Sequence, residues 1–128
     1  RQVRDWLHVG DHCRALDLLI ERAVSGEVYN IGGGNEVMNL DLTRKILSEL
    51  GKSVSLIESV SDRPGHDRRY CLDTTKLRGL GWLPQVAFED GLRETITWYR
   101  RNEWWWRPIK EHDHAFQAHY QAQYENRT

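Results

Sequence analysis

The stretch GEVYNIGGGNEVMNLDLTRKILSELG, residues 26–51, carries the pattern on which the fold prediction rests. Residues 27–31 are rich in strand formers and run into three consecutive glycines. Apolar residues then recur at helical spacing until Gly51, at Leu42, Ile46, Leu47 and Leu50. A strand, a glycine turn and an amphipathic helix in this order predict an α/β unit.

The same alternation continues on both sides of this stretch. We predict further strands at residues 3–9 and 54–57, and further helices at about 11–25, 73–79 and 89–103. Parallel strands need a crossover of about this length, so we expect parallel pairing. A few short strands with about four helices make a poor sheet alone, and we expect them to complete a larger sheet whose other strands precede residue 1.

Composition narrows the class of protein. The 128 residues include 18 basic and 19 acidic ones, for a net charge of -1, which removes bulk electrostatics as an argument for nucleic-acid or membrane binding. Apolar stretches stay well below the ~20 residues of a membrane span, and a cytoplasmic protein with Cys13 and Cys71 reduced is predicted. The sole methionine is Met38 and residue 1 is an arginine, so we expect a piece of a longer chain.

The polar loop SDRPGHDRRY, residues 61–70, is the strongest candidate for chemistry. It gathers arginines and an imidazole around a Pro-Gly turn, at Arg63, His66, Arg68 and Arg69. Because an arginine can donate two parallel hydrogen bonds to phosphate oxygens, such a turn can grip a diphosphate. A solvated loop with internal salt bridges to Asp62 and Asp67 explains the same residues equally well.

Three other features favour structural interpretations. The triple glycine lacks the third glycine of a G-x-G-x-x-G fingerprint, so a turn is favoured over dinucleotide binding. Trp104, Trp105 and Trp106 have basic neighbours that could suit nucleic acid, but packing of the last helix is favoured. His112, His114 and His119 fit no zinc spacing, so no metal site is predicted.

Several motifs in one order resemble a known family. They are RDWLHVGDHCRAL (residues 4–16), GEVYNIGGGNEVMNL (26–40), DRPGHDRRYCLD (62–73) and LGWLPQVAFEDGLRETITWY (80–99). Together they are similar to the carboxy-terminal part of the dTDP-glucose 4,6-dehydratases, which have the extended short-chain dehydrogenase (Rossmann-type) fold. The resemblance covers residues 1–106 as a substrate-binding part and leaves residues 107–128 as a polar tail.

The resemblance implies a set of substrate-binding residues. They are Arg4, Asn39, Asp62, Arg63, Pro64, Gly65, His66 and Tyr124. Of these, Arg63 and His66 are expected to engage the diphosphate. Arg4 could instead be a surface charge at the end of a strand, and Asn39 could be an ordinary helix N-cap.

The resemblance also implies a reaction. The family uses NAD to convert dTDP-glucose to dTDP-4-keto-6-deoxyglucose and water in deoxysugar biosynthesis, and needs tyrosine and lysine four residues apart. No tyrosine here is followed by lysine at that spacing, so we expect no catalytic residue, no NAD site and no activity in this chain alone. The full-length parent would bind NAD and form a homodimer. Two alternatives are the same part of another nucleotide-sugar epimerase or decarboxylase, and a stand-alone nucleotide-sugar binding module.

Overall fold

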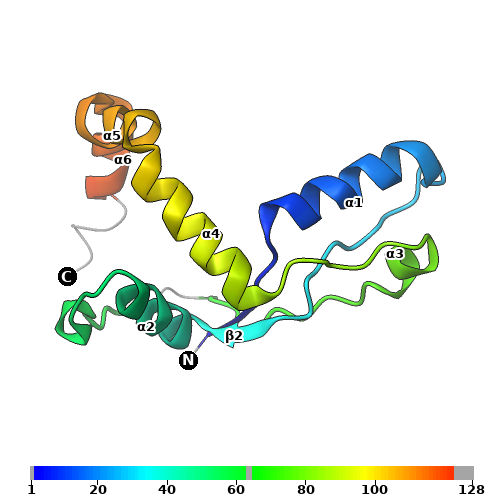
Figure 1. The fold of residues 1–128 in the computed structure, drawn as a ribbon, viewed down its shortest axis with the longest axis horizontal. Coiled ribbons are helices and arrows are strands. Elements are labelled where there is room, and N and C mark those ends of the chain that lie inside the picture. Colours follow the sequence, from blue (N-terminus) through cyan, green and yellow to red (C-terminus); the bar gives the residue numbers. More distant parts are fainter. Residues whose placement is uncertain (1, 63–64, 123–128) are drawn as a thin grey trace.

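The computed structural model describes residues 2–62 and 65–122, which are mostly helical around a two-stranded sheet (Figure 1). The elements in chain order are β1 (Val3–Asp5), α1 (Val9–Arg22), β2 (Glu36–Met38), α2 (Asn39–Glu49), the short 3₁₀ helix η1 (Val54–Leu56), α3 (Thr75–Gly79), α4 (Phe88–Arg101), α5 (Glu103–His112) and α6 (His114–Tyr120). Among the described residues, no helix is long and apolar enough to cross a membrane.

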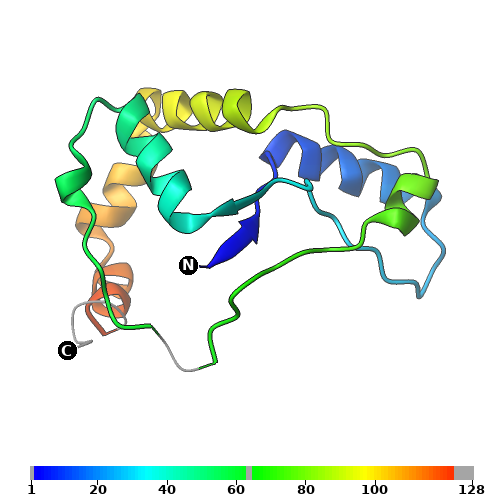
Figure 2. The ribbon, with the colours of Figure 1, turned by 90° about the horizontal axis from the view of Figure 1, so that it is seen from below.

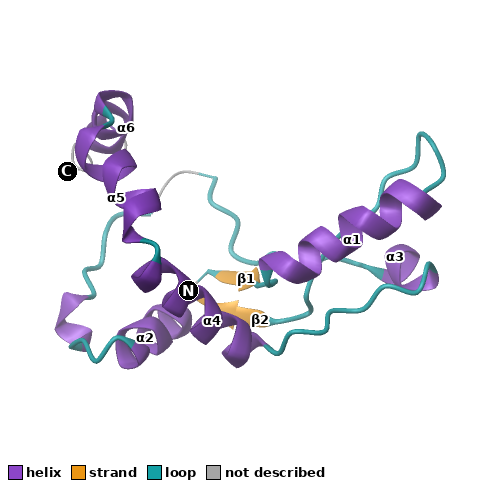
Figure 3. Cartoon of the chain, turned by 45° about the horizontal axis from the view of Figure 1, so that its top comes forward, coloured by secondary structure: helices purple, strands orange, loops and turns teal. Residues whose placement is uncertain are grey.

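The sheet lies at the centre, with β1 beside β2 (Figure 3). The strands are antiparallel, with Val3 opposite Met38, so the expected parallel pairing is wrong for these two strands. A parallel neighbour does lie on the other edge of β1, where Val3 N–H donates to Arg68 O at 2.8 Å and Tyr70 N–H donates to Val3 O at 3.1 Å. Consequently β1 brings the polar loop at residues 61–70 next to the start of the chain.

Three of the predicted helices are confirmed, but two of the predicted strands are wrong. The helix predicted at residues 11–25, the helix predicted to end at Gly51 and the helix predicted at 89–103 correspond to α1, α2 and α4, and α3 lies within the short helix expected at 73–79. Residues 27–31 have no strand assignment and Val28 is 80% exposed, while the strand expected at 54–57 is η1. A strand needs a partner for its backbone hydrogen bonds, whereas a helix supplies its own. None of the described strands pairs with residues 27–31.

A small core joins α1, α3 and the segment before α4. Ala15, Leu77 and Trp82 are buried there. Beside them lies Asp11, whose side chain is completely buried in the first turn of α1. The Asp11 carboxylate accepts hydrogen bonds from the backbone N–H groups of Gln85 at 2.8 Å and Val86 at 3.0 Å. These bonds tie α1 to the chain that leads into α4.

The carboxy-terminal helices form a separate arm. Helix α4 runs from the sheet to α5 and α6, with α2 packed along part of it (Figures 1 and 2). The Trp98 and Trp105 rings meet edge to face at 5.3 Å between centroids, and the Trp106 indole N–H donates to Tyr99 O at 2.9 Å. Trp105 and Trp106 thus contact α4, but Trp105 is still 49% exposed and Trp104 is 73% exposed, so the predicted packing holds only in part. The predicted boundary at residue 106 falls inside α5.

Candidate functional site

Arg4 reaches from β1 across to the polar loop. Its Nη2 donates to His66 Nε2 at 2.8 Å and to the Asp67 backbone oxygen at 2.9 Å, and its Nη1 donates to Val3 O at 2.7 Å. The guanidinium carbon also lies 4.1 Å from the centre of the Tyr70 ring, a cation–π distance. These contacts fix the guanidinium plane even though 62 positions separate Arg4 from His66.

His66 is the centre of a three-residue cluster, which we call the Arg4 cluster: Arg4, His66 and Asp62. One ring nitrogen of His66 faces Arg4, and the other, Nδ1, lies 2.6 Å from Asp62 Oδ1. The second Asp62 oxygen accepts from Gln2 Nε2 at 2.6 Å. His66 is 21% exposed at its side chain, so the imidazole is partly shielded from water. The cluster therefore places a cation, an imidazole and a carboxylate in one hydrogen-bonded row.

Local sequence explains how the loop reaches this geometry. Gly65 has a φ of 71°, in the left-handed region that favours glycine, just before His66. Four positions separate Asp62 from His66, and their side chains meet across this bend. Pairing of residues 68–70 with β1 then holds the other end of the loop.

The structure brings together four of the predicted site residues, Arg4, Asp62, Gly65 and His66. Asn39 lies nearby through the backbone, because its N–H donates to Gln2 O at 3.0 Å. Asn39 is exposed and is the first residue of α2, whose N-cap is Met38, so the interpretation of Asn39 as the N-cap is wrong. The remaining three, Arg63, Pro64 and Tyr124, lie outside the described residues.

The sequence did not predict two residues that contact the Arg4 cluster. Gln2 holds Asp62, and Tyr70 lies against Arg4. The period of two along a strand offered a signal for Gln2, since residues 2 and 4 share one face. The contact of Tyr70 depends on the pairing of its segment with β1, which the sequence did not show.

Arg69, another basic residue of the loop, has a structural partner. Its guanidinium donates to both carboxylate oxygens of Glu36 on β2, at 2.6 and 2.8 Å. These hydrogen bonds from Arg69 lower the pKa of Glu36. The pKa of the neighbouring Cys71 thiol is raised, chiefly by its hydrogen bond to Glu36. The salt bridge of Arg69 thus leads out of the loop to β2, whereas the prediction placed the partners within the loop, at Asp62 and Asp67.

The triple glycine packs against the end of β1. A Cβ on Gly32 would lie 2.5 Å from Asp5 Oδ2, and one on Gly33 would lie 2.6 Å from the Trp6 backbone oxygen. Helix α2 starts only at Asn39, well after the glycines, so its N-terminus does not face this turn as in a dinucleotide fingerprint. The glycines allow close approach within the chain, and they do not fit the phosphates of NAD.

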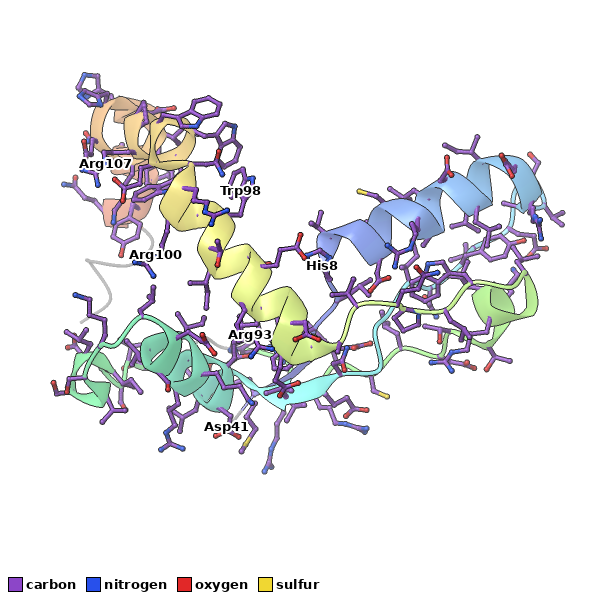
Figure 4. All side chains as sticks on the ribbon, in the orientation of Figure 1. His8, Asp41, Arg93, Trp98, Arg100 and Arg107 are labelled. Atoms are coloured by element: carbon purple, nitrogen blue, oxygen red, sulfur yellow. The ribbon has the colours of Figure 1, made fainter. Side chains whose placement is uncertain are left out.

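Two open apolar hollows border α4. One, of about 260 Å³, is lined by residues that include Trp6, Phe88 and Leu92, and the other, of about 460 Å³, by residues that include Trp98 and Trp105. His8, at the start of α1 (labelled in Figure 4), borders both hollows. Its Nε2 lies 3.7 Å from Oε2 of Glu94 on α4. Neither hollow is lined by the Arg4 cluster, so the polar cluster remains the candidate site.

This chain resembles known proteins over most of its length. Residues 1–95 match the family model described as GDP-mannose 4,6 dehydratase. The dTDP-glucose 4,6-dehydratase of Streptomyces niveus is 55% identical over 113 residues, which are 88% of this chain and 34% of that protein. The chain thus spans about a third of the length of this curated relative.

Solved structures show the same likeness. The dTDP-glucose 4,6-dehydratase of Streptomyces venezuelae, solved with NAD, aligns with a TM-score of 0.80 and 49% identity over 84% of this chain and 34% of that one. The UDP-glucose 4-epimerase of Thermus thermophilus, also solved with NAD, aligns with a TM-score of 0.69 and 30% identity over 77% of this chain and 31% of that one. The fold is therefore part of an extended short-chain dehydrogenase fold. The chain belongs to the GDP-mannose 4,6 dehydratase family and is similar over most of its length to about a third of a dTDP-glucose 4,6-dehydratase.

Proposed function

We propose that this chain is the carboxy-terminal, substrate-binding part of a dTDP-glucose 4,6-dehydratase and that the Arg4 cluster binds the diphosphate of the nucleotide sugar. The complete enzyme would convert dTDP-glucose to dTDP-4-keto-6-deoxyglucose and water. The observation that carries this proposal is the convergence of Arg4, Asp62 and His66, which are distant in sequence. The 49% identity to a solved dehydratase supports the choice of substrate class over the epimerase, at 30%.

Arg4 is the group best suited to a phosphate. A guanidinium stays protonated and offers five N–H donors in a fixed plane. The Tyr70 ring and the acceptors on Val3, His66 and Asp67 hold that plane in place, so less side-chain freedom is lost when a ligand binds. We therefore assign Arg4 to a charge-assisted hydrogen bond with a phosphate oxygen.

The other predicted residues have supporting roles in this proposal. Arg63 contributes a second guanidinium to the diphosphate, and Pro64 and Gly65 shape the turn that presents it. Asn39 and Tyr124 contact the nucleotide. His66 was expected to engage the diphosphate, but both of its ring nitrogens already have partners, so we assign His66 to holding Arg4 instead.

NAD belongs elsewhere in this proposal. The glycine turn does not fit a dinucleotide, and no tyrosine is followed by lysine four residues later. The cofactor site and the catalytic residues would lie in the rest of the enzyme, which would act as a homodimer in the cytoplasm. The chain alone is expected to be inactive, and turnover of dTDP-glucose by the purified 128 residues would contradict this.

Calorimetric titration with dTDP tests the binding role. Replacing Arg4 by alanine should weaken binding by about 1.5 to 3 kcal/mol, or roughly 10- to 150-fold, because a hydrogen bond to a charged group is lost. The matched control is Arg44→Ala on α2, where Arg44 pairs with Asp41 (labelled in Figure 4). The proposal would be refuted if both variants lost the same affinity for dTDP. It would also be refuted if the unsubstituted 128-residue chain showed no saturable binding of dTDP.

A comparison of nucleotides separates the alternatives. If the chain belongs to a dTDP-glucose enzyme, dTDP should bind more tightly than UDP. Preference for UDP would favour the epimerase alternative. If the full-length protein binds dTDP but has no dehydratase activity, the alternative of a nucleotide-sugar binding module would be favoured.

A further inference from the structure

Asp62 carries a negative charge beside a site proposed to bind an anion, and simple electrostatics would make it harmful there. We infer that Asp62 is a positioning residue: its carboxylate selects the tautomer of His66, and His66 in that tautomer seats the guanidinium of Arg4. The effect of Asp62 on ligand binding rests on the proposed function, whereas the tautomer of His66 does not depend on it.

The donors and acceptors of the cluster decide the tautomer. Arginine has only donors, so the 2.8 Å contact from Arg4 Nη2 requires His66 Nε2 to accept. A neutral imidazole that accepts at Nε2 carries its proton on Nδ1. That proton points to Asp62 Oδ1, at 2.6 Å, where a carboxylate can only accept. The hydrogen bonds of the whole row are therefore consistent with one arrangement of protons.

Removing Asp62 would upset this row at its far end. Without the carboxylate, only the contact from Arg4 Nη2 still favours Nδ1–H over Nε2–H. An imidazole protonated at Nε2 presents a hydrogen toward the hydrogens of Arg4, which turns an attractive contact into a repulsive one. Arg4 would then lose one of the acceptors that orient it, although its contacts with Val3, Asp67 and Tyr70 involve other groups.

The other groups around His66 strengthen the assignment. Asp62 itself is held by Gln2, which donates to its second oxygen at 2.6 Å. Asp67 contributes its backbone oxygen to Arg4, so a change of its side chain leaves that acceptor in place. This difference between two acidic residues of one loop provides a matched pair of variants.

Nitrogen NMR of the His66 ring at pH 8 tests the tautomer directly, with no ligand present. The parent chain should show a proton on Nδ1 and an accepting Nε2. In Asp62→Ala the proton should move toward Nε2, whereas Asp62→Asn, whose amide oxygen can still accept, should keep it on Nδ1. Asp67→Asn removes a charge from the same loop and should also leave it on Nδ1. A proton on Nε2 in the parent, or no change in Asp62→Ala, would overturn the inference.

Binding of dTDP at pH 8 tests the consequence through its sign. If charge alone mattered, Asp62→Ala would bind the anion more tightly. If Asp62 positions Arg4 through His66, the variant should bind it about 2- to 10-fold more weakly, because one hydrogen bond that orients Arg4 is lost. In an Arg4→Ala background the effect of Asp62→Ala should disappear, because the two residues act in one row. Unchanged or tighter binding in Asp62→Ala would overturn the positioning role. If the parent binds no dTDP, the proposed function fails, and the NMR result still decides the tautomer.

Discussion

The buried carboxylate of Asp11 should control how α4 is attached to the rest of the chain. Asp11 is completely buried, and it accepts from the backbone N–H groups of Gln85 and Val86. It also pairs with Arg14, whose side chain is 40% exposed. We predict that Asp11→Asn, which keeps the size of the side chain, loosens this attachment.

The magnitude follows from the bonds that change. Asparagine has one side-chain oxygen, so one of the two backbone N–H groups loses its acceptor and faces an NH₂ group instead. A lost hydrogen bond to a charged group costs about 1.5 to 3 kcal/mol. The ion pair to the half-exposed Arg14 adds less than about 1 kcal/mol. The sum is about 1.5 to 4 kcal/mol, a large part of the roughly 5 to 15 kcal/mol that stabilises a typical domain.

Urea denaturation and amide hydrogen exchange would measure the effect. Asp11→Asn should lower the free energy of unfolding by this amount and speed exchange at Gln85 and Val86 more than elsewhere. The matched control is Asp17→Asn, on an exposed position of the same helix, which should stay within about 0.5 kcal/mol of the parent. An Asp11→Asn variant as stable as this control, with exchange unchanged at Val86, would refute the reasoning.

Three further outcomes are expected. Gly33→Ala should destabilise the fold by about 1 to 3 kcal/mol in thermal unfolding, since its Cβ would meet the Trp6 backbone oxygen, whereas Gly79→Ala, with open space around it in α3, should not destabilise it. Arg69 lowers the pKa of Glu36, so the Glu36 carboxylate stabilises the folded chain at pH values above its pKa in the unfolded chain, and this stabilisation is lost as the pH falls through its pKa in the folded chain. The difference in unfolding free energy between the unsubstituted chain and Glu36→Gln should therefore vanish in acid, and a difference that stays constant with pH would contradict this. Glu36 raises the pKa of the Cys71 thiol, so Glu36→Gln should speed alkylation of Cys71 at pH 8, with Cys13 as the internal reference.

The sequence predicted helices α1 to α4 and the strand at β1, but it did not predict β2, α5 or α6. The apolar spacing in α2 and α4 indicated both helices to within a few residues, because a helix closes its hydrogen bonds within its own sequence. Residues 27–31 have a strand-like composition but no neighbouring strand among the described residues, and so they stay irregular. Conversely, β2 forms at residues 36–38 because β1 lies alongside, which composition alone does not reveal.

The residues of the site could be named from the sequence, but their arrangement could not. The resemblance of residues 62–73 to the family pointed to Asp62, Gly65 and His66, and the resemblance of residues 4–16 pointed to Arg4. Their contacts depend on the parallel bridge between Val3 and Arg69, which brings together segments more than 60 residues apart. The same bridge sets the role of Arg69, which pairs with Glu36.

The sequence by itself determined helices α1 to α4, the glycine at the bend and the resemblance to the family, because these depend on short-range spacing and on residue types in a fixed order. Only the tertiary structure decided that Arg4, His66 and Asp62 form one hydrogen-bonded row and that Asp11 is buried. The physical reason is that both depend on contacts between distant segments. The Asp11 carboxylate, for example, leaves water only because backbone N–H groups from another part of the chain satisfy it.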